Sequence, residues 1–177
     1  MTEPQATKPP RVKTIDPSGD VRFNIGPAGQ PSAKLLVNSR VLSFASPVFA
    51  ARFNGCFAEG QGLFSANPRE ISLPEDELCS MEILCNTAHM RAAELPTKME
   101  HTPLANFALL CEKYRSEDNF RTFCRVWIID LLKDTKHNEF RKLLFVAYLL
   151  DLPHEFTEAS KASHTRPCQN QLLNCRT

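Results

Sequence analysis

The chain has 177 residues, of which 42% are hydrophobic and 23% are charged; this balance excludes a wholly disordered or collagen-like protein. Its 21 basic and 20 acidic side chains leave a net charge of +1, which argues against nucleic-acid binding driven by bulk charge, because that needs a clear basic excess. No apolar run approaches the roughly 20 residues of a membrane span, and the polar first residues lack the apolar centre of a secretion signal. We therefore expect one soluble intracellular domain, in the cytoplasm, the nucleus or both.

The first half of the chain carries the signals of strands and turns. All six glycines precede residue 63, and glycine favours turns and weakens helices. Residues 1–17 are Pro-rich and predict a disordered leader. Apolar and polar residues then alternate over 20–25, a Gly-Pro-Ala-Gly turn follows, and a second apolar run covers 33–37. This pattern predicts a β-hairpin.

Two short helices are predicted after the hairpin. Asn38 or Ser39 can cap a helix over 41–45, because both side chains accept hydrogen bonds from free backbone amides. A second helix begins near Pro47, since proline is tolerated in a first turn. The next predicted elements are a strand over 69–73 and a helix over 78–88.

Helical periodicity dominates the second half. Apolar residues recur at spacings of three, four and seven in three segments. The predicted helices cover 104–114, 120–131 and 140–147. From residue 157 the chain is polar and aperiodic, so we predict a disordered tail over 157–177. The sequence thus indicates an α+β domain over 18–133 with a helical extension over 134–156.

The seven cysteines include no Cys-x-x-Cys pair and are predicted to be reduced thiols, several of them in the core. Cys85 and His89 form the best metal-binding pair, because residues four apart share one helix face. A zinc site needs three or four ligands, however, and nothing nearby in the sequence supplies a matching pair. We expect no cofactor and no enzymatic activity. A small metal-binding enzyme built on Cys85 and His89 is the alternative from a different class.

One stretch of the chain resembles a known family. Residues 37–49 (VNSRVLSFASPVF), preceded by Asp20 and Val21 and followed by Phe53, resemble a BTB/POZ domain. Later segments that also fit are 57–59, 71–76, 81–84, 107–114 and 140–148. The chain is similar to the short fungal-type BTB proteins over residues 18–156. It departs from the animal domains at 86–103, where their aromatic strand-and-turn pattern is missing, so we expect the sheet to lose an edge strand.

The resemblance implies an α+β BTB/POZ fold: a small β-sheet flanked by α-helices, with a short C-terminal helical extension. It implies a protein–protein interaction module without catalysis, which pairs with itself or with another BTB protein. In the family the dimer surface comes from the first strand and the first helix. The corresponding residues here are Asp20, Val21, Phe23, Val41, Leu42 and Phe44.

A second family property concerns ubiquitin ligases. Some members bind a cullin scaffold through a hydrophobic-x-Glu motif after the second short helix, and Phe57-Ala58-Glu59 stands in that place. The resemblance therefore implies that Phe57 and Glu59 contact a cullin. The alternative binding role is a transcription or chromatin scaffold whose partner supplies the DNA contact. Neither role involves a membrane or direct contact with nucleic acid.

Overall fold

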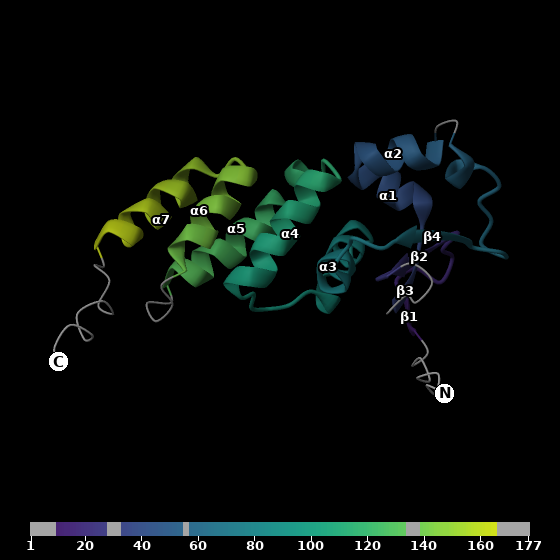
Figure 1. Ribbon diagram of the computed structural model, residues 1–177, viewed down its shortest axis with the longest axis horizontal. Coiled ribbons are helices and arrows are strands. Elements are labelled where there is room, and N and C mark those ends of the chain that lie inside the picture. Colours follow the sequence, from purple (N-terminus) through teal and green to yellow (C-terminus); the bar gives the residue numbers. More distant parts are fainter. Residues whose placement is uncertain (1–9, 28–32, 55–56, 134–138, 166–177) are drawn as a thin grey trace, which may run out of the picture.

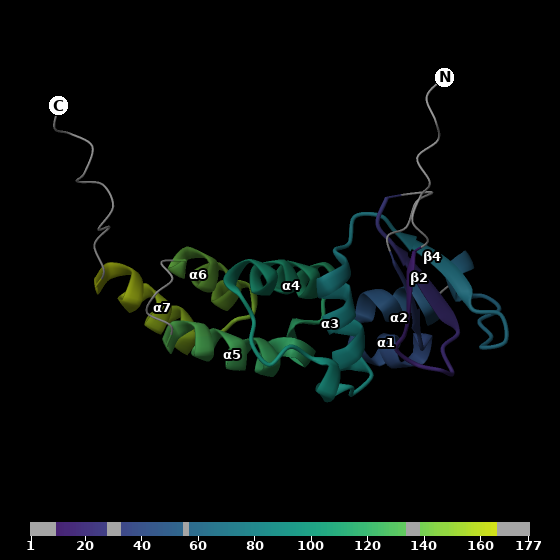
Figure 2. The same ribbon diagram turned by 90° about the horizontal axis from the view of Figure 1, so that it is seen from below.

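The computed structural model describes residues 10–27, 33–54, 57–133 and 139–165. The molecule is elongated, with a β-sheet near one end and the last two helices at the other (Figure 1). Helix α3 (Leu78–Ala88) lies between the sheet and a bundle made by the later helices (Figures 1 and 2). The described chain is therefore a mixed α+β structure, as the sequence predicted.

The sheet has four strands in the order β1-β3-β2-β4. They are β1 (Arg11–Thr14), β2 (Val21–Ile25), β3 (Ala33–Val37) and β4 (Arg69–Leu73). Strands β2 and β3 pair antiparallel, which confirms the predicted hairpin, whereas β1 pairs parallel to β3 and β4 parallel to β2. Residues 86–103 form no strand, in agreement with the missing aromatic pattern, so β4 is an edge of this sheet.

Alternation along β2 separates the two faces of the sheet. Val21, Phe23 and Ile25 are buried on the inner face, because successive side chains of a strand point to opposite sides. The outer face is polar. There the Glu70 carboxylate accepts hydrogen bonds from Lys34, Asn24 and Arg22, and these partners lower its pKa to about 2. The Glu70 carboxylate therefore stays ionised at neutral and mildly acidic pH.

The described part of the chain also contains seven α-helices. Besides α3 they are α1 (Ser39–Ala45), α2 (Pro47–Asn54), α4 (His101–Lys113), α5 (Glu117–Lys133), α6 (Phe140–Leu149) and α7 (Pro153–Thr165). Two short 3-10 turns, η1 (Ala58–Gly60) and η2 (Ala92–Glu94), lie between them. The helices predicted before and after β4, and the three periodic helices of the second half, are confirmed.

Aromatic rings connect the sheet to the helices. Phe49 of α2 stacks on Phe23 of β2, on Phe53 one turn later and on Tyr114 at the end of α4. A second group, in the bundle, packs Phe107 of α4 edge-on against Phe120 and Trp127 of α5. Such ring pairs add about 0.5–1.5 kcal/mol each beyond the area that they bury. The two groups make one continuous core along the molecule.

Two segments differ from the predicted disorder. Strand β1 lies inside the leader, where Ile15 is buried and Lys13 pairs with Glu82 of α3. Helix α7 (Pro153–Thr165) extends into the predicted tail, where Ala159 is buried. Its first turn is anchored just before the tail, because the Glu155 carboxylate accepts a 2.6 Å hydrogen bond from Arg125 of α5. Both elements depend on partners distant in sequence, which composition does not reveal. The remaining parts of the two segments, 1–9 and 166–177, lie outside the described residues.

Among the residues that the structure describes, no helix is long and apolar enough to cross a membrane. The thiols of Cys85, Cys111 and Cys124 are free and buried, and that of Cys79 is free and exposed. This agrees with the prediction of reduced core thiols. Cys56, Cys168 and Cys175 lie outside the described residues.

Candidate functional site

The predicted dimer residue Asp20 has a structural partner inside the molecule. Its carboxylate accepts hydrogen bonds from the Ser39 amide at 2.8 Å and from the Ser39 hydroxyl at 2.7 Å. The Asn38 side chain accepts from the amides of Arg40 and Val41, which confirms the predicted cap of the first helix. Asp20 and Asn38 together fix where α1 begins.

Three of the six predicted dimer residues lie in the core instead of on a surface. Val21, Phe23 and Leu42 have no exposed area. The two strand residues face the helices because they occupy alternate positions of β2, and Leu42 occupies the inward side of α1. In the single chain these three side chains are therefore not available to a second copy, and the dimer surface itself stays a prediction. Their burial stabilises the domain itself.

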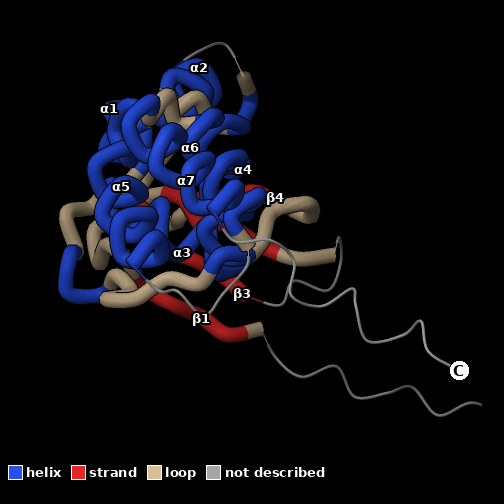
Figure 3. The backbone as a smooth tube through the Cα atoms, turned by 90° about the vertical axis from the view of Figure 1, so that its left-hand side faces the viewer, coloured by secondary structure: helices blue, strands red, loops and turns tan. Residues whose placement is uncertain are grey.

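Phe44 and Val41 lie on the outer side of α1. Phe44 is 89% exposed, although burying a phenylalanine side chain gains about 1.5–3 kcal/mol. Val41 is half-buried. The end of α1 adjoins α5, because Asn119 donates a 2.8 Å hydrogen bond to the Ala45 carbonyl. Figures 2 and 3 place α1 and α5 on the same side of the molecule.

Helix α5 adds two exposed apolar residues, Phe123 and Val126, the latter 60% exposed. They follow Asn119 by four and seven residues, so they share the side of α5 on which Asn119 meets α1. We call the set Val41, Phe44, Phe123 and Val126 the α1 surface. Scattered exposed apolar residues are normal, but several on one side are typical of a surface that is covered in an assembly.

Phe57 and Glu59 belong to a second surface. They border a groove of about 530 Å³. Its other lining residues are Pro47, Val48, Ala51, Arg52 and Arg115. Phe57 is 60% exposed, and Glu59 pairs with Arg52 at 3.7 Å. We call this the α2 groove.

Two backbone features shape the α2 groove. Gly60 packs η1 against the end of α2, where an added Cβ would lie 2.3 Å from the Phe53 carbonyl oxygen, so only glycine fits. Arg115 adopts a left-handed φ of 49° in the turn between α4 and α5. In that turn the Ser116 amide donates to the Cys111 carbonyl, and the Arg115 amide donates to that of Glu112, as in a Schellman helix end.

The groove is apolar along α2 and basic at its rim. Val48 and Ala51 are the outward neighbours of the buried Phe49 and Phe53. In the described part of the chain the Arg115 guanidinium has no ion-pair partner, whereas Arg52 has Glu59. The groove thus offers an exposed aromatic ring beside a free positive charge.

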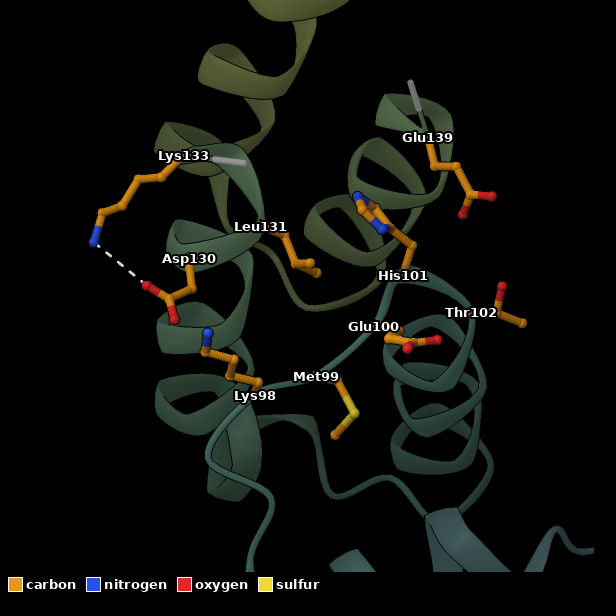
Figure 4. A pocket seen from close by; sticks show the side chains of 9 residues that line it. All are labelled: Lys98, Met99, Glu100, His101, Thr102, Asp130, Leu131, Lys133 and Glu139. Atoms are coloured by element: carbon orange, nitrogen blue, oxygen red, sulfur yellow. Dashed lines mark hydrogen bonds and ion pairs between the residues drawn. The ribbon is translucent and has the colours of Figure 1, made fainter. Parts of the chain in front are cut away.

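Another cavity, of about 770 Å³, lies between the start of α4, the end of α5 and the start of α6 (Figure 4). No predicted site residue lines it. Its charged side chains have both signs: Lys98 and Lys133 are basic, and Glu100, Asp130 and Glu139 are acidic. Asp130 pairs with Lys133, and Glu139 pairs with Lys142. Because its charges offset one another, we do not assign it a function.

The Cys85–His89 pair is not arranged to hold a metal. His89 Nδ1 lies 2.7 Å from the Cys85 carbonyl oxygen, and Nε2 accepts a hydrogen bond from the Asn38 amide at 3.1 Å. Burial raises the pKa of the Cys85 thiol, which disfavours the thiolate that metals bind. The described residues contain no group of three or more potential metal ligands. The spacing places Cys85 on α3 and His89 at its end, but both ring nitrogens of His89 already have hydrogen-bond partners.

Compared with known proteins, the chain matches no family model and no curated protein.

Proposed function

We propose that the chain is a protein–protein interaction module of the BTB/POZ type that self-associates through the α1 surface. The observation that carries the proposal is Phe44, a large aromatic side chain left almost fully exposed on a helix that is otherwise firmly anchored. The small mixed sheet followed by helices and the resemblance in residues 37–49 support it. A two-fold dimer would cover each Phe44 with the equivalent surface of the second copy.

Replacing Phe44 by lysine is expected to raise the dimer Kd by about 30-fold or more, the effect of losing one buried aromatic hot spot. Lysine suits the last turn of a helix, so the fold should be retained. Light scattering and sedimentation equilibrium of the full chain measure the mass. Tyr148→Lys is the matched control, because Tyr148 is also an exposed helical aromatic but belongs to α6.

The expected result is a dimer for the wild type and Tyr148→Lys and a monomer with an unchanged circular dichroism spectrum for Phe44→Lys. A wild-type monomer at high concentration would refute self-association. A dimer that Phe44→Lys leaves intact would place the contact on another surface.

A second function, recruitment to a cullin-type ubiquitin ligase, is favoured by the α2 groove. Phe57 and Glu59 stand where the resemblance expects the hydrophobic-x-Glu motif, and both border the groove. Val48 and Ala51 supply its apolar floor, and Arg115 supplies an unpaired charge. An amphipathic helix fits such a groove by burying apolar residues and placing a carboxylate near the arginine.

Phe57→Ala is expected to weaken binding to a purified cullin N-terminal region by about 30-fold, because an exposed aromatic anchor is a typical hot spot. Isothermal titration calorimetry with the full chain provides the measurement. Phe64→Ala is the control, since Phe64 is similarly exposed in the following loop and does not line the groove. Absence of cullin binding by the wild type would reject this function and favour the transcription or chromatin scaffold.

A further inference from the structure

One imidazole connects the end of α3 to the beginning of α1. The Cys85 carbonyl can only accept, so His89 Nδ1 must carry the hydrogen and donate across the 2.7 Å contact. The other ring nitrogen, Nε2, must then be unprotonated, because it accepts from the Asn38 amide. The two hydrogen bonds hold His89 as one neutral tautomer. We call them the His89 pin.

The residue held by the pin is the cap of α1. While its backbone amide donates to His89, the Asn38 side chain accepts from the amides of Arg40 and Val41 in the first turn. Asp20 secures the neighbouring Ser39 from the other side. Val41 lines the same hollow as His89, and Phe44 follows one turn later. The two residues that α1 contributes to the α1 surface, Val41 and Phe44, therefore follow a helix cap that the pin helps to hold.

A proton on Nε2 would break the pin. The charged ring would present N–H donors at both nitrogens, and one of them would face the Asn38 amide, itself a donor. The charged groups nearby are Asp16, from the loop after β1, and Arg91, just beyond α3. The Arg91 guanidinium donates to the Thr14 and Ile15 carbonyls, which fixes a positive charge beside the ring.

We propose that His89 makes the α1 surface pH-sensitive: protonation of its Nε2 releases the cap of α1, displaces Phe44 and weakens self-association. The inference rests on the proposed function for its biological meaning, whereas the pin itself can be tested on a monomer. The loss of self-association is expected between about pH 5 and pH 7, the range in which histidine is the side chain that ordinarily changes charge.

The direction of the effect follows from proton linkage. Burial, the largest influence, lowers the pKa of His89 below its ordinary value of 6.5; the positive charge of Arg91 lowers it further, while Asp16 and the Cys85 hydrogen bond oppose the shift. A state in which His89 is released therefore binds a proton more readily than the pinned state. The free-energy difference that favours the pinned over the released state is at its full value above pH 6.5. It decreases as the pH falls toward the lowered pKa of His89.

The test compares self-association of the full chain at about pH 7.5 and pH 5.5. Because the released state binds a proton more readily than the pinned state, we expect the wild-type dimer Kd to rise by several-fold at the lower pH. In His89→Gln the amide oxygen can accept from Asn38 without titrating, and we expect less than about twofold change. His154→Gln, which removes an exposed histidine of α7, should respond like the wild type.

Nuclear magnetic resonance provides a readout that needs no dimer. We expect the ring nitrogens of His89 to report the Nδ1–H tautomer at neutral pH, and the Asn38 amide proton to shift with the His89 titration. A dimer Kd that does not depend on pH, an equal pH response in His89→Gln, or an Asn38 amide insensitive to the titration would each overturn the proposal. A monomeric wild type with the expected Asn38 shift would refute self-association but keep the pin.

Discussion

Replacing Phe49 by alanine is expected to lower the free energy of unfolding by about 3–5 kcal/mol, the usual cost of deleting a buried aromatic ring. Phe49 has no exposed area, and its ring centroid lies 5.7 Å from those of Phe23 and Phe53 and 4.4 Å from that of Tyr114. No single neighbour can fill the resulting cavity, because the three rings belong to different elements. Since domains are stable by only about 5–15 kcal/mol, this is a large fraction of the total.

Urea denaturation of the full chain measures this change as a shift of the midpoint at constant slope. Phe64→Ala is the control and should change stability by less than about 0.5 kcal/mol, because Phe64 is 67% exposed. Phe49→Leu should fall between the two, since leucine fills part of the cavity. A loss below about 1 kcal/mol for Phe49→Ala would contradict the ring packing described here.

Replacing Asp76 by alanine is expected to cost about 2–3 kcal/mol. Asp76 lies between β4 and α3, and its carboxylate, with only 1% of the side chain exposed, accepts from the Tyr114 hydroxyl at 2.6 Å and from Lys113 at 2.7 Å. Burial, and after it the hydrogen bond to Asp76, raise the pKa of Tyr114, so the phenol stays protonated and donates. Without Asp76 the buried hydroxyl would lose its acceptor.

A matched series separates the two partners of Asp76. Lys113→Met should cost less than about 1 kcal/mol, because the lysine side chain is 46% exposed and can be rehydrated. Asp76→Asn should cost less than Asp76→Ala, since the amide oxygen can still accept from Tyr114. Adding Tyr114→Phe to Asp76→Ala should recover about 1 kcal/mol, because no unpaired buried hydroxyl then remains. Equal losses for Asp76→Ala and Lys113→Met would assign the stability to the ion pair instead.

The ring packing of Phe49 and the hydrogen bonding of Asp76 both involve Tyr114, which also contacts the elements that carry the α1 surface and the α2 groove. The Tyr114 ring stacks on Phe49 of α2, its hydroxyl donates to Asp76, and its carbonyl accepts a 2.6 Å hydrogen bond from Ser46 between α1 and α2. Arg115, at the rim of the α2 groove, is the next residue. Tyr114 thus contacts both α2, which lines the α2 groove, and the link between α1 and α2. A variant that removes these Tyr114 contacts is expected to weaken binding at both surfaces.

Local patterns determined most of the secondary structure. Alternation gave the hairpin of β2 and β3, and periodicity gave α4, α5 and α6, because amphipathic segments reveal their inner face through the repeat alone. The cap of α1 also followed from residue type, as Asn38 competes well for free amides. The Phe57–Glu59 motif is local too, and both residues border the same groove.

Which apolar residues face outward was decided only by the tertiary structure. Val41, Leu42 and Phe44 look alike in the sequence, yet Leu42 is buried and Phe44 exposed, because α1 packs beside α3 through one side of its short length. Strand β1 and helix α7 form because Lys13 and Glu155 meet partners 69 and 30 residues away. His89 is placed against Asn38, 51 residues earlier. Such pairings depend on how elements pack against one another in space. A pattern of a few neighbouring residues does not determine that packing, because the partners lie far apart in the sequence.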